Sequence, residues 1–246
     1  TATTILTIIK TDEGIDGYGQ ASVDAPFYGE TAESMVVNLK KHVKPNIIGL
    51  NPLNHTDVLR VINQNLPFNN HTFTISAIDM ALWDLKGKIM NTPLYNLLGG
   101  KINEGIKLMG FVHHDTPSEM ANHAKEIIKN KRYKVLKMKI GMNPSDDIKR
   151  YKAVIDAIDD DVCIQVDGNT GYTIDQALPT LKIMEDLGKL GAIEQPVYRN
   201  KDMSTLARHL NTPIMADEAI YGPIDAIDVI DNNSASLALM KISKHG

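Results

Sequence analysis

Short runs of apolar, β-prone residues recur along the second half of the chain, and most of them end in polar residues. Such runs predict strands, and the amphipathic segments between them predict helices. The predicted strands span 106–112, 135–140, 162–167, 191–194, 213–216 and 237–241. The predicted helices include 118–130, 146–158, 174–187 and 203–210. This alternation indicates an α/β domain with parallel strands and the helices outside.

The first hundred residues follow a different pattern. Residues 3–10 predict one strand and 17–21 predict the returning strand of a hairpin. Helical periodicity then predicts helices at about 31–44, 54–64 and 73–90. Strands followed by helices, without alternation, describe a small α+β unit. Because Leu97-Leu98-Gly99-Gly100 ends this pattern, we expect two domains, 1–104 and 105–246.

The second domain is expected to be a partial (β/α) barrel. A closed barrel of this type has eight strands, whereas the alternation supplies six. An open six-stranded sheet would leave unpaired edges and an unfinished core. We therefore expect C-terminal strands to be missing from this chain, which also starts inside a predicted strand rather than at Met.

Polar side chains stand at the ends of five of the predicted strands. They are Lys137 and Lys139, Asp167 and Asn169, Glu194, Asp217, and Lys241. Successive members of the series 139, 167, 194, 217 and 241 are separated by 23 to 28 residues. One β-α unit of a barrel takes about 31 residues, and all its parallel strands open at the same end. These side chains should therefore converge on one pocket.

The three acids in this set predict a metal site. Asp167, Glu194 and Asp217 would repel one another if buried together, unless protonation or a cation relieved the repulsion. Oxygen ligands with room for water and substrate suit a hard divalent ion, Mg²⁺ before Mn²⁺. One acid alone is better explained as a cap of the helix after its strand, but three in register favour the metal.

The lysines predict acid-base chemistry beside that metal. A nearby divalent cation and burial both favour the neutral amine, which can take a proton. Lys139 on the second strand and Lys241 on the sixth would approach a substrate from opposite sides. Lys137 shares a face with Lys139, because residues two apart in a strand point the same way. We interpret Lys137 as the electrostatic partner of a carboxylate, and expect Lys137 and Asn169 to contact substrate.

The composition limits the classes of binding partner and the cellular compartment that we expect. The net charge is −4, without a long basic run, so nucleic acid and anionic membranes are poor candidates. Cys163 is the single cysteine, which excludes an internal disulfide and favours a reducing, cytoplasmic compartment. No apolar run reaches the roughly 18 residues that a membrane-spanning helix needs.

The strand-end motifs together resemble the enolase superfamily, and in particular its muconate-lactonizing-enzyme (muconate cycloisomerase) subgroup. They are Lys137-Met138-Lys139, Asp167-Gly168-Asn169, Glu194-Gln195-Pro196, Ala216-Asp217-Glu218 and Lys241-Ile242-Ser243-Lys244, with Ala77-Ile78-Asp79-Met80-Ala81-Leu82-Trp83-Asp84-Leu85 and Pro93-Leu94-Tyr95-Asn96-Leu97-Leu98-Gly99-Gly100 before them. The resemblance implies an N-terminal α+β capping domain over a modified (β/α)7β TIM-like barrel. It further implies a substrate-specificity loop at 21–30, with Phe27 and Tyr28 as substrate contacts, although an ordinary surface loop is an equal alternative.

The resemblance also implies an isomerase. Mg²⁺ would be bound by Asp167, Glu194 and Asp217, with Lys139 and Lys241 as the acid-base pair. The shared chemistry removes the proton α to the carboxylate of a small-molecule substrate, and the metal stabilises the enediolate. A muconate cycloisomerase-like reaction is the first expectation; dipeptide epimerase, N-acyl-amino-acid racemase and o-succinylbenzoate synthase stay open. Family members are often homo-oligomers.

Two functions from other classes compete with this hypothesis. An inward lysine such as Lys241 can also form an imine, as in a Schiff-base aldolase or lyase, but that reaction has little use for three acids. A barrel that kept a metal for stability alone would show no activity and the same Mg²⁺ affinity after Lys139→Ala.

Overall fold

The computed structural model describes residues 3–23, 29–66, 71–131 and 133–246, and the chain divides into two compact units. The N-terminal unit comprises Thr1–Gly105 and Met240–Gly246, and the barrel unit comprises Ile106–Leu239. The last seven residues thus differ from the predicted division, which gave them to the second domain. The reason lies in their contacts, because the carbonyl oxygen of Ser243 accepts a hydrogen bond of 2.6 Å from the Ser76 hydroxyl.

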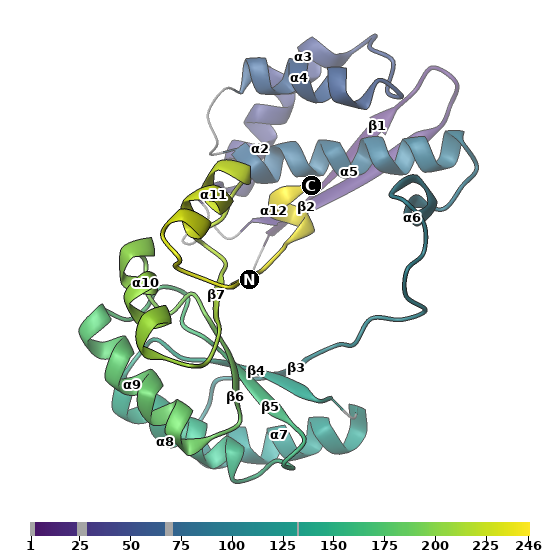
Figure 1. The fold of residues 1–246 in the computed structure, drawn as a ribbon. Helices are drawn as coiled ribbons and strands as arrows, with labels where there is room; N and C mark the ends of the chain where they lie inside the picture. Colours follow the sequence, from purple (N-terminus) through teal and green to yellow (C-terminus); the bar gives the residue numbers. More distant parts are fainter. Residues whose placement is uncertain (1–2, 24–28, 67–70, 132) are drawn as a thin grey trace. The chain divides into compact units, whose positions relative to one another are not determined.

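The N-terminal unit is a hairpin packed with helices (Figure 1). Strands β1 (Thr3–Lys10) and β2 (Asp16–Val23) pair antiparallel. The helices are α2 (Ala32–Val37), the π-helix η1 (Asn38–Val43), α3 (Lys44–Ile47), α4 (His55–Asn65), α5 (Thr72–Ile89), α6 (Leu94–Leu97) and α12 (Ile242–His245). The predicted helix at about 31–44 is therefore three consecutive segments.

Strand β2 lies against the long helix α5. Gly17 and Gly19 make this close approach possible, because a Cβ atom at either position would collide with the carbonyl oxygen of Ala81 or Ala77. Ala77 and Ala81 are themselves fully buried. Small residues on both sides of the contact thus let a helix and a strand pack backbone to backbone.

The barrel unit is α/β with a parallel sheet of strand order β3-β4-β5-β6-β7-β8. The strands are β3 (Gly110–Val112), β4 (Val135–Lys139), β5 (Cys163–Asp167), β6 (Leu190–Glu194), β7 (Ile214–Ala216) and β8 (Leu237–Ala238). The helices are α7 (Pro117–Lys131), α8 (Pro144–Ile155), α9 (Ile174–Leu187), α10 (Asn200–His209) and α11 (Pro223–Asp231). Figure 1 shows α7, α8 and α9 along one side of the sheet.

The two outer strands are shorter than predicted. The strand expected at 106–112 begins only at Gly110, and the one expected at 237–241 ends at Ala238. The amide of Leu239 still donates to the carbonyl of Ala216, but the chain then turns into α12, whose N-cap is Lys241. Each outer strand has one neighbour within the described sheet, so fewer ladder hydrogen bonds hold it extended.

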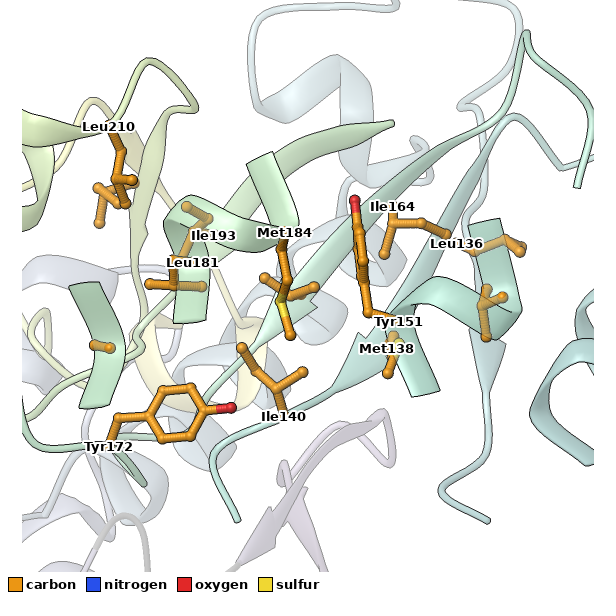
Figure 2. Packing of buried hydrophobic residues seen from close by; sticks show 14 of the residues in the cluster. Leu136, Met138, Ile140, Tyr151, Ile164, Tyr172, Leu181, Met184, Ile193 and Leu210 are labelled. Carbon is orange, nitrogen blue, oxygen red and sulfur yellow. The ribbon is translucent and has the colours of Figure 1, made fainter. Parts of the chain in front are cut away.

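Alternation along the inner strands separates an apolar layer from a polar one. Leu136 and Met138 of β4, Ile164 of β5 and Ile193 of β6 are fully buried. Figure 2 shows these side chains together with Tyr151, Leu181 and Met184 from the helices. Burying one large apolar side chain stabilises the fold by about 1.5–3 kcal/mol. The layer therefore fixes the strands, and the intervening residues necessarily face the other side of the sheet.

The predicted specificity loop at 21–30 is only partly a loop. Residues 21–23 complete β2, with Ala21 and Val23 buried, and Glu30 is buried as well. Phe27 and Tyr28 lie outside the described residues. Within the described part of the chain, none of the helices is long and apolar enough to cross a membrane.

Candidate active site

Neighbouring strands place the predicted residues side by side. Lys139 pairs in register with Asp167, and Asp167 pairs with Glu194. Glu194 pairs in turn with Met215 of β7, and Asp217 directly follows β7. Asp167 is 1% exposed, and Glu194 and Asp217 are 0% exposed. Three carboxylates are therefore buried at one end of the sheet.

A buried lysine lies between two of these acids. The Nζ atom of Lys137 is 2.6 and 2.8 Å from the two oxygens of Glu194 and 2.8 Å from Oδ2 of Asp167. Burial by itself lowers the pKa of Lys137, but the charges and hydrogen bonds of Asp167 and Glu194 outweigh burial and raise that pKa. Lys137 is therefore charged and pairs with both acids.

The acids themselves differ in their affinity for protons. Burial and then the charge of Asp167 raise the pKa of Glu194 to about 7, despite Lys137. Burial also acts to raise the pKa of Asp167, but Lys137 and Lys139 outweigh it and lower that pKa. Gln165 donates a further hydrogen bond of 2.5 Å to Glu194. Of the two acids that share Lys137, Glu194 therefore takes up a proton first.

Lys139 is the accessible amine of the site. Its Nζ atom donates to Oδ2 of Asp167 at 2.6 Å and to Oδ1 of Asn169. Its side chain is 46% exposed, whereas that of Lys137 is 10% exposed. The amide nitrogen of Asn169 donates in turn to Glu218 at 2.8 Å. The structure thus brings Lys137, Lys139, Asp167 and Asn169 together as the sequence predicted, and adds Glu218.

Unusual backbone geometry accompanies these side chains. Asn169, Thr170 and Gln195 adopt positive φ angles of 39°, 62° and 32°. Non-glycine residues in this region are strained and persist only where the surroundings hold them. The Oε1 atom of the fully buried Gln195 accepts from the amides of Asp217, at 2.9 Å, and Ala219, at 3.1 Å. One side chain at the end of β6 therefore positions the acids that follow β7.

A further buried carboxylate, Asp147, joins the neighbouring loops. Oδ2 of Asp147, which is 0% exposed, accepts from the hydroxyl of Tyr172 at 2.6 Å and from the amides of Gly141 and Met142 at 3.2 Å. Its other oxygen accepts from Arg150 at 2.5 Å. Asp147 thus links the loop after β4 to the loop after β5, and these two strands end in Lys139 and Asp167.

Three further residues were predicted for the site: Lys241, Phe27 and Tyr28. Lys241 caps α12 in the N-terminal unit instead of ending a strand of the barrel unit. Its opposition to Lys139 across a substrate therefore stays a prediction. The same holds for Phe27 and Tyr28 as substrate contacts.

The donor set fits a hard divalent cation in type and in charge. Asp167, Glu194 and Asp217 offer only oxygen atoms, the ligands that Mg²⁺ prefers. Beside them, Oε2 of Glu218 is buried without a hydrogen-bond donor from the described residues. Nevertheless, across the described ranges no three His, Cys, Asp or Glu side chains are arranged as a metal site. Instead, the ammonium group of Lys137 bridges Asp167 and Glu194.

Comparison with known families places the chain. Residues 1–99 match the family model described as "Mandelate racemase / muconate lactonizing enzyme, N-terminal domain". Residues 119–246 match the model "Enolase C-terminal domain-like". The chain therefore belongs to the mandelate racemase/muconate lactonizing enzyme family of the enolase superfamily, which confirms the resemblance of the strand-end motifs.

Individual relatives within this family have several activities. The chain is 33% identical to the N-succinyl-L-Arg/Lys racemase of Bacillus cereus, over 98% of this chain and 65% of the racemase. It is 31% identical to muconate cycloisomerase 1 of Pseudomonas putida, over 100% of this chain and 66% of that enzyme. The crystal structure of the Enterococcus faecalis dipeptide epimerase complexed with Mg and L-Leu-L-Tyr matches with a TM-score of 0.91 and 30% identity, over 100% of this chain and 68% of that one.

The Mg-containing epimerase complex supports Mg²⁺ as the metal of this family. The chain spans about two thirds of the length of the curated relatives that it matches. These relatives are a racemase, a cycloisomerase and an epimerase, so the comparison does not separate these reaction types for this chain.

Sequence analysis gave no role to two polar residues of this site. Gln165 stands inside the apolar run of β5, two residues before Asp167, so both side chains point to the same face. Its buried amide contacts Glu194. Glu218 was noted only as the neighbour of Asp217. A polar residue within an apolar strand was the available signal for Gln165, whereas the contact of Glu218 with Asn169 depends on the fold of two separate loops.

Proposed function

We propose that the full-length protein is a Mg²⁺-dependent isomerase that removes the proton α to the carboxylate of a small-molecule substrate. The arrangement at the ends of β4, β5 and β6 is the observation that carries this proposal. An accessible amine, Lys139, stands in register with two fully buried acids. Membership of the family supports the same chemistry.

Asp167, Glu194 and Asp217 would hold the cation, which is Mg²⁺ in the related epimerase complex, with Mn²⁺ as a possible substitute. A bound divalent cation supplies positive charge that stabilises the negative charge developing on the substrate carboxylate. Lys137 neutralises part of the charge of Asp167 and Glu194 and orients both carboxylates through its hydrogen bonds.

Lys139 would move the proton. In its neutral form the amine accepts the α-proton of the substrate, and in its charged form it returns a proton. The side chain is the more exposed of the two lysines on β4, so it can reach a substrate. Asn169, which contacts the amine, would bind both the lysine and the substrate.

Two reaction types share this proton removal. Cycloisomerisation of a muconate-like substrate is the first candidate, and it needs one acid-base lysine. Epimerisation of a dipeptide or racemisation of an N-acyl amino acid needs an acid-base group on each face of the α-carbon. The second lysine, Lys241, supports this second candidate, as do the racemase and epimerase relatives.

Deuterium exchange tests the shared step. Muconates, dipeptides and N-acyl amino acids are incubated with the Mg²⁺-loaded full-length protein in D₂O, and exchange and product are followed by NMR. We expect exchange or turnover with at least one class, and a loss of about 10²–10⁴-fold for Lys139→Met. Lys149→Met, which alters a lysine that is 64% exposed on α8, is the matched control and should retain full rate.

Lys241→Ala distinguishes the two candidates. If the protein racemises or epimerises, this variant should lose reaction from at least one enantiomer while exchange from the other survives. Full activity in both directions would contradict the role of Lys241. Activity that survives EDTA and is trapped by borohydride would instead establish the Schiff-base alternative.

Location and assembly stay predictions from the sequence. The single cysteine favours the cytoplasm, and the family favours a homo-oligomer. Size-exclusion chromatography with light scattering of the full-length protein measures the oligomeric state directly.

A further inference from the structure

Three polar side chains, one at the end of β4 and two in the loops after β5 and β7, form a continuous hydrogen-bonded series in the barrel unit. Glu218, which follows β7, accepts from Nδ2 of Asn169 at 2.8 Å. Asn169, which follows β5, accepts through Oδ1 from Nζ of Lys139 at the end of β4. The series thus starts at a residue without an assigned role and ends at the amine that would move the proton.

The amide of Asn169 gives this series a direction. A carboxamide has a donating nitrogen on one side and an accepting oxygen on the other. Because Oε1 of Glu218 accepts the hydrogen bond from Nδ2 of Asn169, it holds that nitrogen toward itself. The oxygen is then turned toward Lys139, which has only donors. Without Glu218, either orientation of the amide would be open.

The surroundings hold Glu218 in place at a cost in stability. Its backbone lies between Asp217 and Ala219, whose amides both donate to the buried Gln195. Oε2 of Glu218 is buried and receives no hydrogen bond from any residue that the structure describes. A buried acceptor without a donor destabilises a fold, so its presence calls for an explanation other than stability.

We infer that Glu218 is a positioning residue that sets the orientation of the Asn169 amide and thereby holds the Lys139 amine at the substrate. This inference rests on the proposed function, in which Lys139 moves the α-proton. Rates of proton transfer depend steeply on such placement, because a displacement of about 1 Å can cost about 100-fold. Glu218 therefore acts through another residue and does not itself move a proton.

A pair of substitutions separates the accepting oxygen from the bulk of the side chain. Glu218→Leu removes the acceptor, and we expect kcat to fall about 10–100-fold with KM nearly unchanged. Glu218→Gln keeps one accepting oxygen for Asn169, and its kcat should stay within about threefold of the wild-type value. Wild-type kcat in Glu218→Leu, or an equal loss in both variants, would overturn the inference.

A double-mutant cycle tests whether the effect passes through Asn169. Adding Glu218→Leu to Asn169→Ala should produce no further loss of kcat, because the amide that Glu218 orients is already gone. A further loss as large as that in the wild-type background would contradict the inference. Mg²⁺ affinity and thermal stability are measured on the same variants. We expect Glu218→Leu to bind Mg²⁺ as the wild type does and to be at least as stable, whereas weakened Mg²⁺ binding would assign Glu218 to the metal instead.

A readout that needs no turnover keeps this inference apart from the proposed function. The side-chain amide signals of Asn169 are identified in NMR spectra by their loss in Asn169→Ala. Their protons should be protected from solvent exchange in the wild type and in Glu218→Gln, and unprotected in Glu218→Leu. An unprotected wild-type amide would overturn the inference. If the amide is protected but no carboxylate reacts, the proposed function fails and the hydrogen-bonded series remains.

Discussion

Two buried glutamates, one in each unit, have opposite surroundings. Glu30 in the N-terminal unit is 2% exposed and accepts from the amides of Phe73, at 2.7 Å, and Thr74, at 3.2 Å, and from the hydroxyl of Thr74, at 2.5 Å. Glu194 in the barrel unit is 0% exposed and lies near the charges of Asp167 and Asp217. Glu30 caps a helix, whereas Glu194 is crowded by like charges.

The contrast shows that burial of a carboxylate does not by itself indicate a functional site. The N-terminus of α5 offers free backbone N–H groups and a positive partial charge, so one carboxylate is fully satisfied there without a cation. At the ends of β5 and β6, two buried carboxylates, Asp167 and Glu194, share the ammonium group of Lys137, and Asp167 also pairs with the more exposed Lys139. Buried carboxylates held close together are what a site for a divalent cation requires.

Removal of the buried ammonium group of Lys137 should have the largest effect on stability. Lys137→Met leaves Asp167 and Glu194 without their shared partner, and breaking a buried ion pair costs about 3–5 kcal/mol. Urea unfolding in EDTA measures this loss, and added Mg²⁺ should restore part of it if the acids bind the ion. Lys149→Met on the surface of α8 should unfold as the wild type does. Equal stability of Lys137→Met and wild type would contradict the ion-pair assignment.

Removal of the helix cap should have the next largest effect. Glu30→Leu leaves the amides of Phe73 and Thr74 without this acceptor, and we expect a loss of about 2–3 kcal/mol. Glu30→Gln is the matched control, because its oxygen can face the two amides while its nitrogen donates to the hydroxyl of Thr74. Thermal unfolding should therefore place Glu30→Gln between the wild type and Glu30→Leu; similar losses in both would show that charge, rather than hydrogen bonding, is decisive.

The crowding of Glu194 predicts an unusual pH dependence for the metal-free protein. An acid whose folded pKa is about 7, above its ordinary value of 4.5, holds its proton longer in the folded state. Its contribution to stability is complete below pH 4.5 and is lost as the pH rises to 7. We expect the free energy of unfolding to fall across this window, measured by urea unfolding in EDTA. Glu194→Gln should lack this fall, and parallel profiles would contradict the assignment.

The smallest effect concerns a glutamate far from the candidate site. Burial alone would raise the pKa of Glu185, but hydrogen bonds from Thr212, Lys182 and Asn211 lower it to about 2. Its contribution to stability is therefore present above pH 4.5 and is lost as the pH falls toward 2. Glu185→Gln should cost about 1 kcal/mol at pH 7 and reduce the sensitivity to acid. The neighbouring Asp186→Asn, 65% exposed, should have no measurable effect.

The inner strands of the barrel unit were predictable because they carry strong local signals. Apolar residues alternate with polar ones in 136–139 and in 164–167, and the predicted strands 135–140 and 162–167 each differ from the observed strand by one residue at one end. The proximity of Asp167, Glu194 and Lys139 was predictable because parallel strands place their C-terminal ends together. The outer strands were predicted too long, since their extent depends on neighbours rather than on the apolar run.

The division of the chain was harder to predict. Residues 237–241 were read as one strand, yet the structure ends the strand at Ala238 and packs the residues after Leu239 with the N-terminal unit. The contact that decides this joins Ser76 to Ser243, which are 167 positions apart. Local periodicity carries no information about such a partner.

The sequence by itself determined the α/β pattern, the family, and the residue types at the strand ends, because each depends on short-range order or on motifs. Only the tertiary structure decided which groups share a proton or a hydrogen bond: Lys137 between two acids, Gln165 on Glu194, and Glu218 on Asn169. The reason is physical. Charge and hydrogen-bond energies change over one or two ångströms, whereas the strand pattern fixes only the face and the end of the sheet at which a side chain emerges.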